Sequence, residues 1–180
     1  MNGTRYLLEH SSTERLIFRK FSAADYTDWF PFYLDPASTG FWEGIPDSPD
    51  RACRSQFDRI FERYDKGLGG MNALIEREQQ VLVGMCGLLI QEVDGKSEME
   101  IGYSLLPGFR GMGFATEAGI HCRDKAFANA WAESLISIIH IDNTPSINVA
   151  LRLGMTLDTT TQYKGNPVHI FRVDKAHQSL

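Results

Sequence analysis

The chain has 180 residues, of which 43% are hydrophobic and 23% charged, and its formal net charge at pH 7 is −5. This length and composition suffice for one sizeable hydrophobic core, so we expect a single domain over residues 1–180. The acidic balance and the absence of any run of Lys or Arg argue against a nucleic-acid binder, because binding to the phosphate backbone depends on clustered basic residues. No apolar segment approaches the roughly 20 residues that span a bilayer, and no secretory signal opens the chain, so no membrane association is expected.

The chain contains three cysteines, Cys53, Cys86 and Cys122, an odd number without C-x-x-C or metal-ligand spacing. Such a set favours neither a disulfide framework nor a zinc site. We therefore expect reduced, packed thiols, no bound metal and a cytoplasmic location.

The N-terminal third predicts one strand and two helices around an irregular loop. Residues 14–21 alternate loosely between apolar and polar and predict a strand, and Ser22 is a good N-cap for a helix over residues 23–32. Residues 34–50 hold three prolines and two glycines and predict a loop, whereas residues 51–66 return to helical periodicity.

The middle of the chain predicts an antiparallel meander followed by a crossover. Residues 71–76, 81–91 and 98–106 are strand-like runs separated by segments short enough for hairpins. After a glycine turn and a helix over residues 114–130, residues 135–141 are apolar almost throughout, which is typical of a strand buried on both faces. Because a helix leads to it, this strand should lie parallel to residues 98–106.

The last part of the chain predicts a short helix and a closing hairpin. Asn or Thr in the segment 143–146 can cap the helix, with Pro145 in its first turn, and Gly154 ends it. Residues 155–163 and 168–173 then read as two paired strands.

The glycine turn Arg110-Gly111-Met112-Gly113-Phe114-Ala115 stands between a predicted strand and a predicted helix. Free N–H groups at a helix start suit an anion, and glycines remove the Cβ atoms that would hold a phosphate away. Glycines also occur in turns simply because they adopt positive φ, so the spacing alone leaves both interpretations open. The spacing G-x-x-x-x-G-K-[ST] is absent, and so is G-x-G-x-x-G, which excludes a Walker A loop and argues against a dinucleotide site.

Taken together, the motifs resemble the GCN5-related N-acetyltransferase (GNAT) family, and within it the RimJ and RimL branch that acetylates N-terminal amines of ribosomal proteins. Residues 110–115 resemble the family signature [QR]-x-x-G-x-[GA], and residues 100–103 resemble the strand before it. Residues 143–146, with residues 153–155 at the helix end, are similar to the branch's N-x-x-S helix. Residues 13–19 resemble its opening strand, so the likeness covers nearly the whole chain.

The resemblance implies a mixed α/β (α+β) fold with a central, mostly antiparallel sheet of about seven strands, splayed between the fourth and fifth and flanked by about four helices. It implies acetyl-CoA as the acetyl donor, with pantetheine inserted in the splay, where its amides satisfy unpaired strand backbone. The backbone of residues 110–115 would hold the pyrophosphate, with side-chain charge from Arg110 as a further anchor. The implied cofactor-binding positions are Ser104, Leu105, Leu106, Arg110, Gly111, Met112, Gly113, Phe114, Ala115 and Asn143.

Two residues are candidates for the chemistry. Glu100 is the leading general base, directly or through water, for the attacking amine; the alternative is a solvated strand carboxylate in an ion pair. Many family members place a tyrosine four residues before the helix-terminal glycine, but this chain has Ala150 there. In the RimJ and RimL branch the serine of N-x-x-S takes that place, which maps to Ser146 as a hydrogen-bond donor to the leaving thiolate. Ser146 could instead bond local backbone, and Asn143 could act only as a helix cap.

The acceptor is left open by the sequence. Phe41, Trp42 and Glu43, in the irregular loop, are candidates for substrate contact, with loop packing as the alternative. We expect N-acetylation of a primary amine, in the first place a protein or peptide N-terminus, by direct attack in a ternary complex. A small amine such as a polyamine, an amino sugar or an antibiotic fits the same motifs, and so does a non-catalytic CoA-binding regulatory module. The oligomeric state, a homodimer included, is left open.

Overall fold

Within residues 5–175, which the computed structural model describes, the strands form one seven-stranded mixed sheet. Its order is β1-β2-β3-β4-β5-β7-β6, and β4 with β5 is the parallel pair among antiparallel neighbours. The strands are β1 (Leu16–Lys20), β2 (Gly69–Glu76), β3 (Leu82–Val93), β4 (Lys96–Leu105), β5 (Ser134–His140), β6 (Thr156–Tyr163) and β7 (Asn166–Asp174). The expected sheet, with its parallel pair at the fourth and fifth strands, is confirmed.

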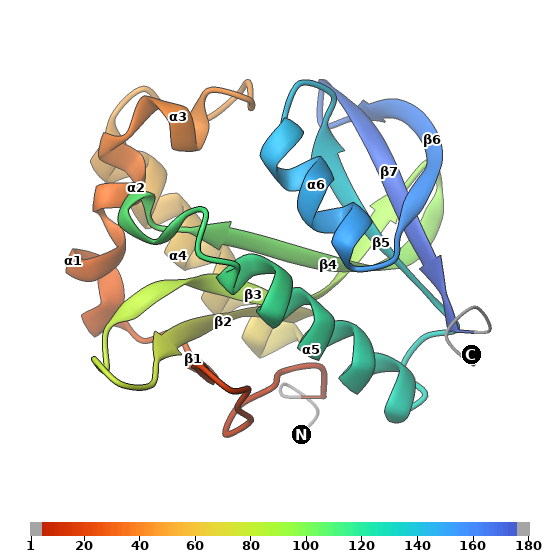
Figure 1. The fold of residues 1–180 in the computed structure, drawn as a ribbon. Helices are drawn as coiled ribbons and strands as arrows, with labels where there is room; N and C mark the ends of the chain where they lie inside the picture. The colour runs from red at the N-terminus through yellow and green to blue at the C-terminus, as the bar shows by residue number, and fades with distance from the viewer. Residues whose placement is uncertain (1–4, 176–180) are drawn as a thin grey trace.

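Three longer helices of the described chain cover the sheet, α4 (Pro49–Lys66), α5 (Phe114–Ala128) and α6 (Thr144–Arg152). Figure 1 shows α5 and α6 on one face of the sheet and α4 on the other. Gly113 precedes α5 and Asn143 caps α6, as the sequence predicts, whereas α4 begins two residues before the expected position 51, with Ser48 as its cap. The α4 helix ends at Gly67, which adopts the left-handed conformation with φ of 65°.

The helix expected over residues 23–32 is divided into short pieces. The turn η1 (Ala23–Asp25) is followed by α1 (Tyr26–Trp29) and α2 (Pro31–Leu34), and a further short helix, α3 (Pro36–Thr39), lies in the segment 34–50, for which the sequence predicts a loop. Pro31 and Pro36 each stand in the first turn of a new piece, because proline lacks the N–H that would continue the preceding helix. The consequence is a chain that turns repeatedly over one end of the sheet and delivers α3 beside the site described below.

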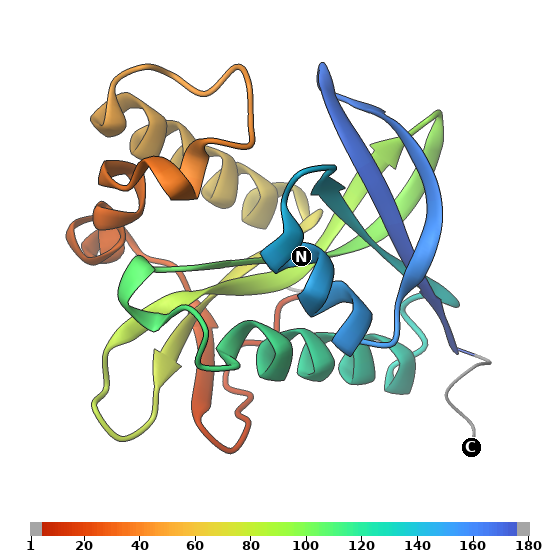
Figure 2. The ribbon, with the colours of Figure 1, turned by 45° about the horizontal axis from the view of Figure 1, so that its top comes forward.

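Two hydrophobic layers enclose the sheet. Leu16, Phe18, Leu74 and Leu88 pack with α5 and α6 on one side, and the other side is filled by an aromatic cluster centred on the fully buried Trp29. Sequence periodicity explains this division, since alternate residues of a strand point to opposite faces. The β3–β4 hairpin bends so that its tip lies beside β6 and β7 (Figure 2), where Thr161 Oγ1 donates to Asp94 Oδ1 at 3.1 Å.

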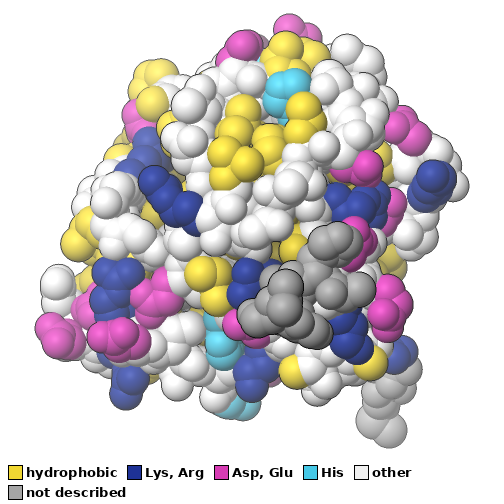
Figure 3. All heavy atoms as spheres, turned by 45° about the vertical axis from the view of Figure 1, so that its right-hand side comes forward, with side chains coloured by type: hydrophobic (Ala, Val, Ile, Leu, Met, Phe, Trp, Pro, Cys, Tyr) yellow, Lys and Arg dark blue, Asp and Glu magenta, His cyan; other side chains and the backbone are white. Residues whose placement is uncertain are grey.

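The surface mixes charges of both signs. On the face turned forward in Figure 3, basic and acidic side chains are interspersed. The three cysteines are buried, with the sulfurs of Cys86 and Cys122 3.5 Å apart. Between residues 5 and 175 no helix has the length and apolarity needed to cross a membrane, and no group of His, Cys, Asp and Glu is arranged to hold a metal ion.

Candidate active site

The site begins where the sheet divides. In the described chain, β4 and β5 are in register at one residue pair, Glu100 with Ile136. Beyond it Ser137, buried in β5, donates its hydroxyl to the Ile101 carbonyl at 2.8 Å, and the Tyr103 hydroxyl donates to the Ser146 carbonyl of α6 at 2.8 Å. Side chains thus replace backbone pairing, and from about residue 102 the β4 backbone edge that faces away from β3 is not paired with β5.

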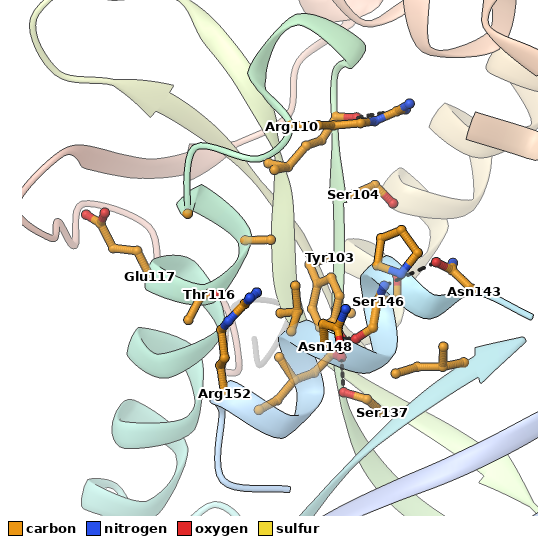
Figure 4. Close-up of a pocket in the computed structure, with 18 of the residues that line it drawn as sticks. Tyr103, Ser104, Arg110, Thr116, Glu117, Ser137, Asn143, Ser146, Asn148 and Arg152 are labelled. Carbon is orange, nitrogen blue, oxygen red and sulfur yellow. Dashed lines mark hydrogen bonds between the residues drawn. The ribbon is translucent and has the colours of Figure 1, made fainter. Parts of the chain in front are cut away.

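A cavity of about 1330 Å³ occupies this split. Ligand pockets usually span roughly 300–1,000 Å³, so the space exceeds what one small molecule needs. Its glycine end is formed by Gly111 and Gly113 before α5, and its aromatic end by Phe41 and Trp42 in the loop after α3. Residues of β4 and the start of α6 also line the cavity, and Figure 4 shows Tyr103 and Ser104 of β4 with Ser146 of α6.

At the glycine end the backbone is shaped for an anion. Gly113 has φ of 84° and precedes the first helical residue, and Gly111 has φ of 75°. A Cβ at Gly111 would have no neighbour within 4 Å, so the space beside it is open. The Glu117 N–H donates to the Gly113 carbonyl at 3.0 Å, which is the first hydrogen bond of the helix. The N–H groups of the residues between these two have no partner within the helix and are directed out of its N-terminal end.

Arg15 holds this turn in place from the start of the chain. Its Nη1 donates to the Met112 carbonyl at 2.9 Å, and its guanidinium lies 4.6 Å from the centre of the Phe114 ring. Nε and Nη2 both lie 2.7 Å from Glu117 Oε2, and Thr13 donates to Oε1 at 2.6 Å. Burial alone would raise the pKa of Glu117, but these hydrogen bonds outweigh it and lower the pKa below its usual value.

The Arg110 side chain is directed toward α3. Its Nη1 lies 2.7 Å from Asp35 Oδ2, Nη2 donates to Ser38 Oγ, and Nε donates to the Leu105 carbonyl at 3.3 Å. The guanidinium therefore links the glycine turn to the segment that leads into the aromatic end. A further role in binding pyrophosphate stays a prediction.

The start of α6 supplies a second polar group. Asn143 Oδ1 accepts from the Ser146 N–H at 3.2 Å, so the helix-cap role expected for Asn143 is present. Both side chains line the cavity, and Figure 4 shows Ser146 beside Tyr103 and Asn148. On the next turn Arg152 faces Thr116 of α5 across the cavity (Figure 4).

Glu100 lines the cavity at the point of divergence. Gln91 Nε2 donates to its Oε2 at 2.7 Å, and the Tyr163 hydroxyl donates to Gln91 Oε1 at 3.1 Å. Burial raises the pKa of Glu100, and the hydrogen bonds from Gln91 and the Ile138 backbone, with the field of Arg63, offset part of that rise. The carboxylate is half-buried, hydrogen-bonded to Gln91 and adjacent to open space.

The loop expected to contact substrate reaches across to the C-terminal half. The Phe41 and Trp42 rings lie 6.0 and 6.3 Å from the His140 ring at the end of β5. The Glu43 N–H donates to Oδ1 of the buried Asn166 at 2.7 Å. Phe41 and Trp42 line the cavity, whereas the Glu43 side chain is exposed and lies outside the lining.

The comparisons with known proteins agree with this geometry. The family model described as "Acetyltransferase (GNAT) domain" matches residues 15–156. The chain belongs to the GNAT acetyltransferase family. It is therefore an acetyl-CoA-dependent N-acetyltransferase.

Individual relatives and structures are similar over most of this GNAT chain. The uncharacterised N-acetyltransferase p20 of Bacillus licheniformis is 28% identical over 143 residues, 79% of each chain. An acetyltransferase structure from Agrobacterium tumefaciens str. C58 is 27% identical with a TM-score of 0.76, covering 92% of this chain and 94% of that one. Mycobacterium smegmatis RimJ in complex with CoA-disulfide has a TM-score of 0.74 at 16% identity, covering 92% and 84%, a likeness of fold.

The GNAT cavity gathers most of the residues that the sequence singled out. Those that line it are Phe41, Trp42, Glu100, Ser104, Leu105, Arg110, Gly111, Gly113, Ala115, Asn143 and Ser146. Leu106 and Phe114 are instead buried in the core, and Met112 points outward with 51% of its surface exposed. Sequence reasoning missed Arg15, Gln91, Tyr103, Ser137 and Tyr163, whose roles depend on contacts between distant segments. Of these residues, Arg15 carried a signal in the sequence, because it is an arginine at the start of the first predicted strand.

Proposed function

We propose that this enzyme acetylates a primary amine, in the first place the N-terminal amine of a protein or peptide, by direct attack on acetyl-CoA in a ternary complex. The observation that carries the proposal is the half-buried carboxylate of Glu100, held by Gln91 at the point where β4 and β5 part. An anion cradle lies at one end of the same cavity and an aromatic wall at the other. This arrangement provides for a phosphate-bearing donor and a separate acceptor.

On the donor side, different groups bind the pyrophosphate, the pantetheine arm and the leaving sulfur. The pyrophosphate is bound by the first-turn N–H groups of α5 beside Gly111 and Gly113. The pantetheine amides pair with the open edge of β4 at Ser104 and Leu105. Ser146 donates a hydrogen bond to the sulfur as it leaves, since a hydroxyl is too weak an acid to transfer its proton fully.

On the acceptor side, Glu100 takes a proton from the ammonium so that a neutral amine can attack. An α-amine has a pKa near 8 and a lysine-type amine near 10, so a carboxylate base is better matched to an N-terminal amine. The ribosomal-protein acetyltransferases among the fold neighbours, including one named from Vibrio cholerae with a TM-score of 0.74, are consistent with that acceptor class.

Turnover of an amine panel tests the proposal. Purified protein is incubated with acetyl-CoA and either N-terminal peptides, lysine-type amines or polyamines, and free thiol is followed over time. We expect thiol release that depends on the amine and is fastest with α-amines. Binding of CoA without thiol release from any amine would replace the enzyme with a CoA-binding module, and faster turnover of polyamines would replace the acceptor class.

Ser146→Ala separates chemistry from binding. We expect kcat to fall with little change in the KM for acetyl-CoA, because the hydroxyl acts on the leaving sulfur. Equal losses in both parameters would reduce Ser146 to a binding or capping residue.

A further inference from the structure

The acceptor half of the cavity is apolar apart from one carboxylate. This half, which we define by its described lining, comprises Phe32, Phe41, Trp42, Met71, Leu89 and Glu100. A Cβ built on Gly102 would lie 3.0 Å from Leu89 Cδ1 and 3.3 Å from Met71 Cε, so this part of the floor is closely packed. An acceptor in this half would meet mainly hydrocarbon and aromatic surface, together with Glu100 and Ser38 of α3.

The distribution of charge in the cavity is one-sided. Of the arginines that line it, Arg15 donates to the glycine turn, Arg152 lies on α6, and Arg110 is directed toward α3, where it pairs with Asp35 at 2.7 Å. Two further cations, Arg63 and Lys164, lower the pKa of Glu100 through their field, but neither is part of the lining. An acceptor carrying a carboxylate beside its amine would bring a second anion to Glu100, and Arg110, the lining arginine directed toward α3, is already paired with Asp35.

The loop that carries Phe41 and Trp42, the aromatic wall of the cavity, is held by two contacts. Asn166 Oδ1 accepts the Glu43 N–H at 2.7 Å, and its Nδ2 donates to the Lys164 carbonyl at 3.0 Å, which fixes the loop to the β6–β7 hairpin. Trp42 packs against the buried cluster that contains Ile138 and Val168. A wall fixed in this way presents a preformed apolar surface rather than one that adapts to each substrate.

We propose, on the basis of the acetyltransferase function above, that the preferred acceptor carries an aromatic or branched apolar group next to its amine and no carboxylate there. For a peptide this group is the first side chain, so N-terminal Phe or Leu is acetylated faster than Ala, Asp or Lys. The amine contacts Glu100 while the apolar group contacts Phe41 and Trp42. Burying a larger apolar group in such a pocket is worth about 10- to 200-fold in kcat/KM per added methylene or its equivalent.

The test is a series of amidated dipeptides X-Ala in which X is Phe, Leu, Ala, Asp or Lys. At fixed acetyl-CoA we expect kcat/KM for Phe and Leu to exceed that for Ala by at least about tenfold, with Asp below Ala. Asp or Lys equal to or faster than Phe overturns the proposed class while leaving acetyl transfer intact. Acetylation of none of the series, nor of small amines, overturns the acetyltransferase function itself.

Three variants connect the preference to the acceptor half. Trp42→Ala should lower the Phe-to-Ala ratio of kcat/KM several-fold without changing the KM for acetyl-CoA. Gly102→Ala adds a methyl to the floor and should slow the Phe substrate more than the Ala substrate. Trp131→Ala is the matched control, because Trp131 is also half-buried but packs on Tyr6, outside the cavity lining. The ratio is measured within each variant, so a reduced folded fraction cancels, and an unchanged ratio in Trp42→Ala contradicts the proposal.

Discussion

The pKa of Glu100 is set mainly by the groups that surround its carboxylate. Burial raises its pKa above the ordinary value of 4.5, and Gln91 limits the rise by donating to the carboxylate. A raised pKa makes the carboxylate a stronger base once ionised. On the proposed mechanism, activity should therefore increase as the pH rises through that pKa, since only the ionised form accepts a proton.

Replacing this carboxylate should remove most of the activity. Glu100→Gln should lower kcat/KM roughly 10²-fold, the usual contribution of a general base, and its acid limb should move up to the pKa of the amine, near 8, because only amine that is already neutral can then attack. Glu98→Gln is the matched control, because Glu98 lies two residues earlier on β4 and pairs with Arg172 at 2.8 Å. A pH profile of Glu100→Gln that retains the wild-type acid limb would exclude Glu100 as the base.

Gln91 should set the position of that limb. Gln91→Leu removes the hydrogen bond that lowers the pKa of Glu100, so the acid limb of kcat/KM should move to higher pH. Tyr163→Phe removes only the hydroxyl that holds Gln91, at 3.1 Å, and should produce a smaller shift in the same direction. A limb that stays in place or moves to lower pH in Gln91→Leu would contradict the assignment.

At the scale of elements, the glycine turn before α5 is suited to the donor by its backbone conformation and by the open space beside it. Gly111 and Gly165 of the β6–β7 turn both have positive φ, at 75° and 80°, and at neither position would an added Cβ have another atom within 4 Å. An alanine at either position carries the same backbone strain of about 1–2 kcal/mol. Only at Gly111 would the added methyl meet a bound phosphate.

The variants Gly111→Ala and Gly165→Ala together test whether the glycine turn before α5 binds the phosphates of the donor. Gly111→Ala should raise the KM for acetyl-CoA roughly tenfold, equivalent to about 1.4 kcal/mol, whereas Gly165→Ala should leave it unchanged. Thermal unfolding of the two variants should show similar losses of stability. Equal KM values for acetyl-CoA in the two variants would show that the turn does not contact the donor.

Some elements could be predicted from the sequence and others could not. The parallel pairing of β4 and β5 follows from an apolar run reached through a helix, and the start of α6 follows from Asn143 and its proline. The division of the first helix depended on Pro31 and Pro36, which the apolar spacing masked. The insertion of β7 between β5 and β6 is set by tertiary packing, and only the buried β7 pattern against the exposed β6 hints at it.

The same limit applies to the candidate site, where residues within short motifs could be predicted but contacts between distant segments could not. Glu100, Ser146 and the glycine turn could be singled out because short motifs carry them. The groups that tune Glu100 could not, since Tyr163 lies 72 residues from the Gln91 that it contacts, and Ser137 lies 36 residues from Ile101. Such pairs are fixed by strand register, which single-sequence patterns do not determine.

For the whole molecule, binding of the donor should stabilise the fold. CoA at 100 times its Kd should contribute about 2.7 kcal/mol by mass action. For a chain of this size that corresponds to a rise of about 5–10 °C in Tm, measurable by calorimetry. The rise should be smaller for Gly111→Ala than for Gly165→Ala at the same CoA concentration, and no rise at saturating CoA would contradict a preformed donor site.

The single register pair between β4 and β5 has a consequence for the catalytic cycle. On the proposed binding mode, pantetheine supplies the missing neighbour of β4, so the donor is a temporary strand of the enzyme's own sheet. Amide hydrogens along this edge of Ile101–Leu105 should then exchange with solvent as at an open margin before binding and as in a sheet interior afterwards. After CoA departs, the two halves of the sheet remain joined by the pair at Glu100 and by side-chain bonds such as Ser137–Ile101, Tyr163–Gln91 and Arg172–Glu98. Product release then returns one edge of β4 to solvent, so the sheet is complete only while the donor is bound.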